Sequence, residues 1–128
     1  MSDNEIVILS GARTAIGTFG GSLAAVPPIE LATVVTRAAI ERAGIAADKI
    51  GTVVFGHVLN TEPRDMYLSR VAMLDAGVPN TTPAMNVNRL CGSGAQAIVS
   101  ATQALLLGDA DFAVAGGAES MSRAPYAV

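Results

Sequence analysis

The feature that most constrains the fold is an alternation of short apolar runs with longer amphipathic patterns. The runs have the length of buried strands, and the longer patterns close at glycines, as helices commonly do. Strands are expected at residues 5–11, 49–58, 83–88 and 111–117, and helices at 29–44, 66–77 and 92–108. The order β-α-β-α-β-α-β favours an α/β fold with a mostly parallel sheet and helices on its faces.

The first helix carries clear start and stop signals. Pro28 suits the first helical position, Glu30 suits the positive end of the helix dipole, and Gly44 suits the C-terminus. Its apolar face is expected to hold Leu31, Val34, Val35 and Ala38. The preceding segment 12–27 is rich in glycine and small residues and is expected to be a loop.

The third helix differs because its apolar residues surround it almost completely. These residues are Ala97, Ile98, Val99, Ala101, Ala104, Leu105, Leu106 and Leu107. A helix that is apolar all round is usually buried all round, so we expect a buried third helix with protein on both sides. The 51% hydrophobic content of a 128-residue chain also indicates contact with another subunit or a further part of the same protein.

Composition excludes several classes of function. The net charge is −3 with scattered basic residues, which argues against nucleic acid. No stretch reaches roughly 18 uninterrupted apolar residues, so no membrane association is expected. The N-terminus resembles neither a secretory signal nor a transit peptide, and one cysteine cannot form an internal disulfide. A cytoplasmic location is therefore expected, and no metal site is predicted.

The single cysteine, Cys91, lies in "NRLCGSGAQA" at the predicted start of the third helix. Unpaired backbone N–H groups and the helix dipole favour a thiolate there, and they can also stabilise an oxyanion. Gly92 and Gly94 allow an acyl chain to approach closely. The alternative is ordinary packing, because free cysteine is among the most buried residue types.

A second interpretation of the same stretch is a dinucleotide-binding turn. Gly92, Gly94 and Ala97 match the pattern G-x-G-x-x-G/A, and Glu119 follows the next strand. That motif normally follows the first strand of a fold directly, whereas this one follows the third. Asn86, Asn88 and Arg89 also interrupt the approach, so the isolated match is weak.

Three long stretches resemble the thiolase family, specifically acetyl-CoA acetyltransferases and β-ketothiolases. They are "ARTAIGTFGGSL" (12–23), "FGHVLNTEPRDMYLSRVAMLDAGVP" (55–79) and "VNRLCGSGAQAIVSATQALLLGDADFAVAGGAESMSRAPY" (87–126). The resemblance implies Claisen chemistry that makes or cleaves 3-ketoacyl-CoA, through an acyl group carried on Cys91, as in fatty-acid metabolism. Half of one oxyanion hole would come from the Cys91 backbone N–H. Leu90, Gly92 and Met121 are the candidate substrate-binding residues.

The resemblance also implies what the chain lacks. Thiolases are much longer. Their activating histidine lies in a Gly-His-Pro motif, their second, acid/base cysteine lies in a Cys-x-Gly-Gly-Gly motif, and an Asn-Glu-x-Phe segment orders a catalytic water. None of these motifs occurs here. Residues 1–128 are therefore interpreted as the N-terminal part of a thiolase N-domain, without the loop domain and the C-terminal domain. The implied partners are acyl-CoA or CoA, a missing C-terminal half or companion chain, and further copies in a homodimer or homotetramer. No cofactor beyond the CoA thioester substrates is implied.

Other residues have weaker interpretations. His57 is expected to be structural. Arg13 is expected either to pair with Glu119 or Asp111 or to be solvated. Tyr126, like Met121, is expected to line an acyl pocket or to pack in an interface. Asp65 is expected to cap the second helix.

The strand at 83–88 is expected to lie at a sheet edge, since Pro83, Asn86 and Asn88 suit an edge better than a central strand. The resemblance to thiolases implies that this edge pairs with another protomer.

Two functional alternatives stay open. A ketoacyl synthase also carries a cysteine on a buried helix, and malonyl-thioester turnover would favour it. A non-catalytic fragment that acts only in assembly would instead have an inert Cys91. The expectation for this chain by itself is no thiolase turnover, because Cys91 is its only thiol and His57 its only imidazole.

Overall fold

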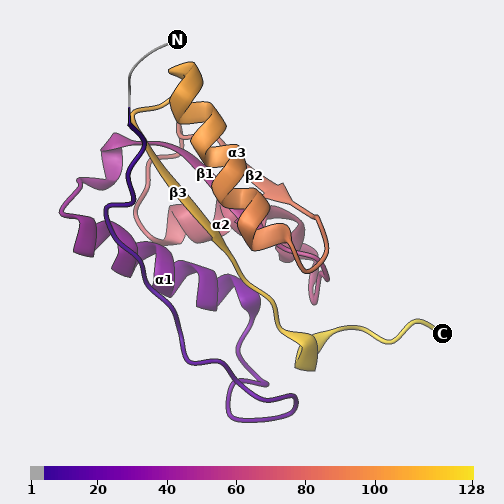
Figure 1. The fold of residues 1–128 in the computed structure, drawn as a ribbon. Coiled ribbons are helices and arrows are strands. Elements are labelled where there is room, and N and C mark those ends of the chain that lie inside the picture. The colour runs from indigo at the N-terminus through magenta and orange to yellow at the C-terminus, as the bar shows by residue number, and fades with distance from the viewer. Residues whose placement is uncertain (1–4) are drawn as a thin grey trace.

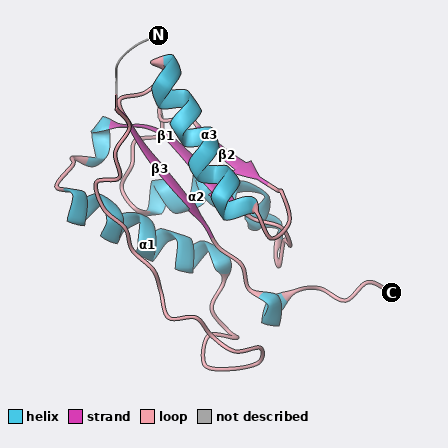
Figure 2. Cartoon of the chain, in the orientation of Figure 1, coloured by secondary structure: helices cyan, strands magenta, loops and turns pink. Residues whose placement is uncertain are grey.

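A computed structural model describes residues 5–128 as a three-stranded parallel sheet with helices on both faces (Figures 1 and 2). The strands are β1 (Ile50–Gly56), β2 (Ala84–Val87) and β3 (Phe112–Gly117), in the order β2-β1-β3. The α-helices are α1 (Pro28–Ala43), α2 (Leu68–Asp75) and α3 (Ser93–Leu107). Three short 3₁₀ helices are η1 (Ala47–Lys49), η2 (Pro63–Tyr67) and η3 (Met121–Arg123). The predicted α/β class and parallel sheet are confirmed.

Alternation along β1 divides the core into two layers. Val53 and Phe55 face the side covered by α1 and α2, where Leu68 and Met73 are fully buried. Val54 faces the opposite side, which is covered by α3. Successive side chains of a strand point to opposite faces, and both faces of β1 are buried. Its sequence at residues 53–55 is therefore a continuous run of apolar residues rather than an alternating one. β1 thus anchors both layers of the molecule.

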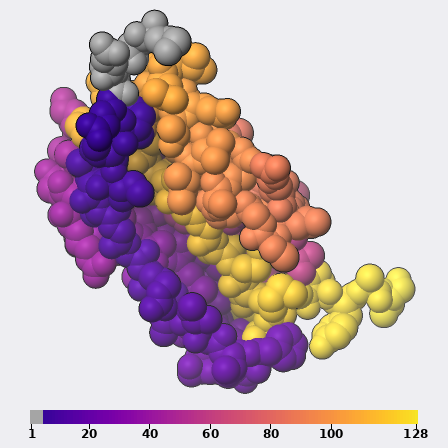
Figure 3. All heavy atoms as spheres, viewed as in Figure 1, coloured from indigo at the N-terminus to yellow at the C-terminus, as the bar shows by residue number. Residues whose placement is uncertain are grey.

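The predicted first strand, residues 5–11, is wrong. This segment runs along α1, where Ser10 Oγ donates to Ala39 O at 2.6 Å and Arg42 donates to Gly11 O at 2.9 Å. Within residues 5–128, no backbone hydrogen bond joins it to β3. A groove separates residues 5–11 from β3, and Figure 3 shows it as the hollow between the N-terminal segment and α3. Without a hydrogen-bonded neighbour an apolar extended segment is not a strand.

α1 has the predicted ends but turns a different face to the sheet. Gly44 adopts the left-handed conformation (φ 66°) and closes the helix, as expected. The buried residues are Pro28, Ile29, Ala32, Thr36 and Ile40, whereas Val34 is exposed. A pattern of hydrophobic residues does not predict the burial of Thr36. Its hydroxyl can be buried because it donates a hydrogen bond to Ala32 O at 2.7 Å.

The second helix starts later than the predicted 66–77. The chain first forms η2, whose N-terminus is a capping box: the Glu62 side chain accepts from the Asp65 backbone and the Asp65 side chain accepts from the Glu62 backbone. Asp65 therefore caps a 3₁₀ turn that leads into α2 rather than α2 itself. Gly77 (φ 95°) follows the helix, as predicted.

Residues 5–128 cover α3 on one face only, so the expected protein on its other face stays a prediction about a further part of the enzyme or another subunit. Ala97 and Ala101 pack on the sheet, but Ile98, Val99, Leu106 and Leu107 are exposed. The reason is that no element of residues 5–128 covers the outer face (Figure 1). By length and composition alone, Leu90–Leu107 could cross a membrane, but core helices of other proteins meet the same criteria. The packing of α3 on β1 and β3 is typical of such a core helix.

Candidate active site

Cys91 lies exposed in the turn between β2 and α3, two residues before the helix begins. Its position follows from the fold, because the carboxyl ends of parallel strands are where α/β proteins place reactive groups. Leu90, immediately before it, has φ 51°, which makes it the only non-glycine residue with positive φ among those described. This left-handed conformation costs a non-glycine residue about 1–2 kcal/mol, so the surrounding contacts must hold it.

Two side chains hold the turn from its two ends. Asn88 Oδ1 accepts from Leu90 N at 3.0 Å. Ser93 Oγ accepts from Arg89 N at 2.8 Å and donates to Leu90 O at 2.6 Å. Ser93 is buried, so these hydrogen bonds are protected from solvent exchange. The turn that presents Cys91 is thus fixed by neighbours in the sequence rather than by Cys91 itself.

A close backbone contact sets where α3 starts. A Cβ added to Gly56, at the end of β1, would lie 2.5 Å from Ser93 C and 2.7 Å from Gly94 N. At Gly56, only glycine permits such an approach of a strand end to the first turn of a helix. Gly117, at the end of β3, makes an ordinary contact there, since its Cβ would lie 3.6 Å from Gly94 Cα. Gly56 therefore places Cys91 at the edge of the sheet.

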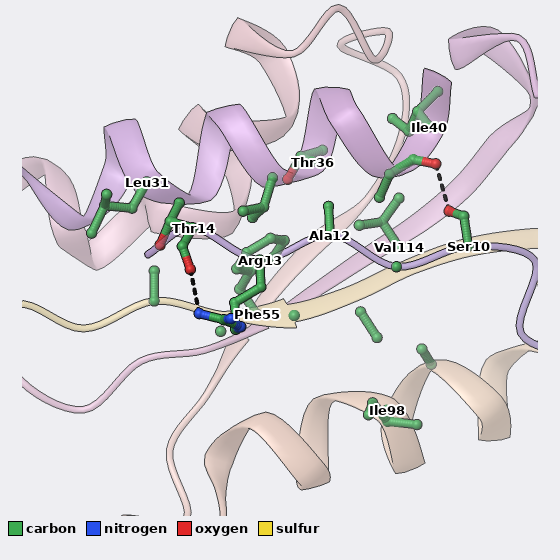
Figure 4. A pocket seen from close by; sticks show the side chains of 18 of the residues that line it. Ser10, Ala12, Arg13, Thr14, Leu31, Thr36, Ile40, Phe55, Ile98 and Val114 are labelled. Atoms are coloured by element: carbon green, nitrogen blue, oxygen red, sulfur yellow. Dashed lines mark hydrogen bonds between the residues drawn. The ribbon is translucent and has the colours of Figure 1, made fainter. Parts of the chain in front are cut away.

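The other predicted substrate-binding residues divide into two locations. Leu90 and Gly92 are exposed beside Cys91. Met121 lies on η3, beyond the end of β3, and lines the large groove instead. That groove has a volume of about 920 Å³ and runs along β3 between the N-terminal segment, α1 and α3 (Figures 3 and 4). Cys91 is not among its lining residues.

The predicted ion pair of Arg13 is not formed in the described chain. Arg13 is exposed and donates to Thr14 O at 2.7 Å (Figure 4), so the solvated alternative holds. Glu119 instead accepts from the backbone of Val58 and Leu59, both at 3.0 Å, and ties that loop to the end of β3. A prediction from charge alone missed this because the donors are backbone groups.

His57 is buried at the carboxyl end of β1, as expected for a structural residue. Its Nδ1 lies 2.8 Å from Ala118 O. Among residues 5–128 no group of three His, Cys, Asp or Glu residues could hold a metal ion, and this includes His57 with Asp65 and Glu119.

Asn86 is a structural residue whose role the sequence interpretation missed. Its Oδ1 accepts from Ser69 N at 2.9 Å, and its Nδ2 donates to Asp65 O and Met66 O, both at 3.2 Å. It therefore links β2 to the start of α2. β2 does lie at an edge of the described sheet, as predicted. The polarity of Asn86, however, serves contacts inside the molecule, a role that a pattern along one strand does not reveal.

Comparison with known proteins identifies the family. Residues 6–128 match the model of the N-terminal domain of thiolase. The chain is 64% identical over 122 residues to a β-ketothiolase, BktB, and 48% identical to an acetyl-CoA acetyltransferase, both of Cupriavidus necator. Each match covers 95% of this chain and 31% of the relative. The chain therefore belongs to the thiolase family and spans about a third of the length of these relatives.

Solved structures agree with this assignment. The crystal structure of the Bacillus anthracis acetyl-CoA acetyltransferase superposes with a TM-score of 0.88 at 41% identity, over 95% of this chain and 31% of that one. Human mitochondrial 3-ketoacyl-CoA thiolase gives a TM-score of 0.91 at 37% identity, over 94% and 30%. The family assignment leaves the dinucleotide-binding interpretation of Gly92, Gly94 and Ala97 without support.

Proposed function

We propose that this chain is the nucleophile-bearing part of an acetyl-CoA C-acyltransferase that makes or cleaves 3-ketoacyl-CoA. The observation that carries the proposal is the exposure of Cys91 in a clamped turn at the N-terminus of α3. The thiolate attacks the thioester carbonyl of an acyl-CoA, the CoA thiolate leaves, and the acyl group stays on Cys91. Attack by an acetyl-CoA carbanion on acyl-Cys91 then forms the new C–C bond and releases 3-ketoacyl-CoA. In the reverse direction Cys91 attacks the 3-keto carbonyl of a 3-ketoacyl-CoA, the C–C bond breaks, and the acetyl-CoA carbanion leaves and takes up a proton. The CoA thiolate then attacks acyl-Cys91 and releases acyl-CoA.

The groups that complete this chemistry must come from outside the described chain. Claisen condensation needs a base for the α-proton of acetyl-CoA and an oxyanion hole for the enolate. Cys91 is the sole cysteine and His57, which is buried, the sole histidine. We propose that a further part of the enzyme, on the same or another chain, supplies these groups and the residues that bind CoA. The chain alone then has no turnover.

Two apolar surfaces support the need for a further part. One is the outer face of α3, with Ile98 and Leu107 exposed, and the other is the groove along β3. Exposed apolar surfaces of this extent usually mark an interface. We propose that the remaining part of the enzyme packs on both, that β2 pairs with a second copy in a homodimer or homotetramer, and that the enzyme is cytoplasmic.

The test is acyl trapping. The chain is mixed with the part of the Cupriavidus necator β-ketothiolase that follows the matched region, and acetyl-CoA is added. An acetyl group on the tryptic peptide 90–123 is expected, absent in the Cys91→Ala variant. The mixture should also cleave acetoacetyl-CoA. Acetylation that persists in Cys91→Ala, or robust turnover by the chain alone, would contradict the proposal.

A further inference from the structure

His57 faces hydrogen-bond acceptors at both ring nitrogens. On one side, Nδ1 lies 2.8 Å from Ala118 O and 3.6 Å from Glu119 Oε1. A backbone carbonyl can only accept, so Nδ1 must carry a hydrogen and donate it. On the other side, Nε2 is buried without a hydrogen-bond partner and lies 4.0 Å from Asp65 Oδ2.

Asp65 is a fully buried carboxylate whose contacts favour its ionised form. Its Oδ2 accepts from Thr61 N at 2.6 Å, from Thr61 Oγ1 at 2.7 Å and from Glu62 N at 3.2 Å. With three donors on Oδ2, a proton has no place there. A proton on Oδ1 would have no acceptor, because that atom has no partner in the structure. The hydrogen-bond pattern is therefore that of a carboxylate anion.

A buried anion requires a positive partner. The desolvation of an isolated carboxylate costs several kcal/mol, which a counter-charge has to offset. Among residues 5–128, the only basic side chain within 4.0 Å of Asp65 is His57, which can become a cation by taking up a proton. The nearby Glu62 is already engaged by Arg123, at 3.5 Å. The other acidic group that faces the ring is Glu119, from the segment after β3, so both acidic neighbours favour a charged ring.

A neutral ring would leave two acceptors facing each other. With the hydrogen on Nδ1, a neutral Nε2 would be a buried acceptor 4.0 Å from Asp65 Oδ2. Asp65 Oδ2 keeps its three donors, but Nε2 and Asp65 Oδ1 would both be buried acceptors without a partner, which is costly. One added proton on Nε2 turns that nitrogen into a donor and gives Asp65 its counter-charge. At 4.0 Å the contact is an ion pair rather than a direct hydrogen bond.

We propose that His57 in the folded chain is a doubly protonated imidazolium that joins Asp65 to Glu119 and Ala118. The ring takes up one proton from solvent as the chain folds, and no other reactant is involved. It acts as an electrostatic link between η2 and the segment after β3, across the end of β1. Because both ring nitrogens then carry hydrogens, His57 has no lone pair with which to act as a general base. This protonation state goes beyond the proposed function and does not depend on it.

The test uses the fact that His57 is the only histidine. Long-range ¹H–¹⁵N correlation spectra of the ¹⁵N-labelled chain at pH 7 contain the imidazole signals of this residue alone, and dispersed amide signals from the same sample report folding. Both ring nitrogens are expected at the shifts of protonated nitrogen. The overturning result is an Nε2 signal in the range of an unprotonated ring nitrogen, which would indicate a neutral ring.

A pair of matched variants tests the partner. Asp65→Asn removes the buried charge, so the Nε2 proton should be lost at the same pH. Asp75→Asn removes the same charge from an exposed position at the end of α2 and should leave both signals unchanged. If Asp65→Asn keeps an unchanged imidazolium, Asp65 is not the counter-charge. If Asp65→Asn does not fold, the wild-type spectrum alone decides the protonation state.

Discussion

Gly56 offers the sharpest test of how the strand end positions Cys91. A Cβ at this residue would lie 2.5 Å from Ser93 C and 2.7 Å from Gly94 N, and both are backbone atoms of the first turn of α3. Real Cβ atoms do not approach other heavy atoms within 3.0 Å, and backbone cannot rotate away as a side-chain tip can. The Gly56→Ala variant must therefore displace the start of α3 or the end of β1.

The expected magnitude follows from the cost of overpacking. Inserting a methyl group into a closely packed site costs about 1–3 kcal/mol, and a clash with backbone belongs at the upper end of that range. We expect Gly56→Ala to lower the free energy of unfolding by about 2–3 kcal/mol. With a urea m-value of about 1–3 kcal/mol/M, the midpoint should fall by roughly 0.7–3 M. In the complemented enzyme kcat should also fall by about 10²-fold, because a small displacement of a reacting group is costly.

Urea denaturation followed by circular dichroism measures the effect on stability, with Gly11→Ala as the matched control. Gly11 is exposed, has no positive φ, and a Cβ there would meet no atom within 4 Å. Its unfolding free energy should change by no more than about 0.5 kcal/mol. Equal stability of the Gly56→Ala and Gly11→Ala variants would refute the argument that the strand end limits the approach of α3.

Two further substitutions test other contacts of the site. Asn86→Ala should lower the free energy of unfolding by about 1–3 kcal/mol, because Ser69 N and the carbonyl of Asp65 lose their hydrogen-bond partner. The control in the same urea titration is Asn80→Ala, at an exposed side chain without a hydrogen bond. Equal urea midpoints of the two variants would contradict the linking role of Asn86. Leu90→Gly should raise the free energy of unfolding by about 0.5–1 kcal/mol, because glycine adopts the φ of 51° without strain and Leu90 is exposed. Calorimetry measures this change, and a lower melting temperature would show that the leucine side chain contributes more than its backbone strain costs.

Much of the local structure could be predicted because its causes lie close together in the sequence. Pro28 and Gly44 delimit α1, and the apolar run of β1 and the glycine after α3 are read from single segments. The position of Cys91 before α3 was predictable for the same reason. Its local clamps, Asn88 and Ser93, lie within three residues of it and follow known turn chemistry.

The amino-acid sequence by itself determined the α/β class, the order of the elements from α1 onward and the place of Cys91 at a helix start. Only the tertiary structure decided that residues 5–11 are not a strand. A strand needs a hydrogen-bonded neighbour, and a groove separates residues 5–11 from β3. It also decided that Gly56 contacts α3 and that His57 faces Asp65 and Glu119. Gly56 and Ser93, like His57 and Glu119, are dozens of residues apart in the sequence, and packing in three dimensions, not local pattern, brings such residues together.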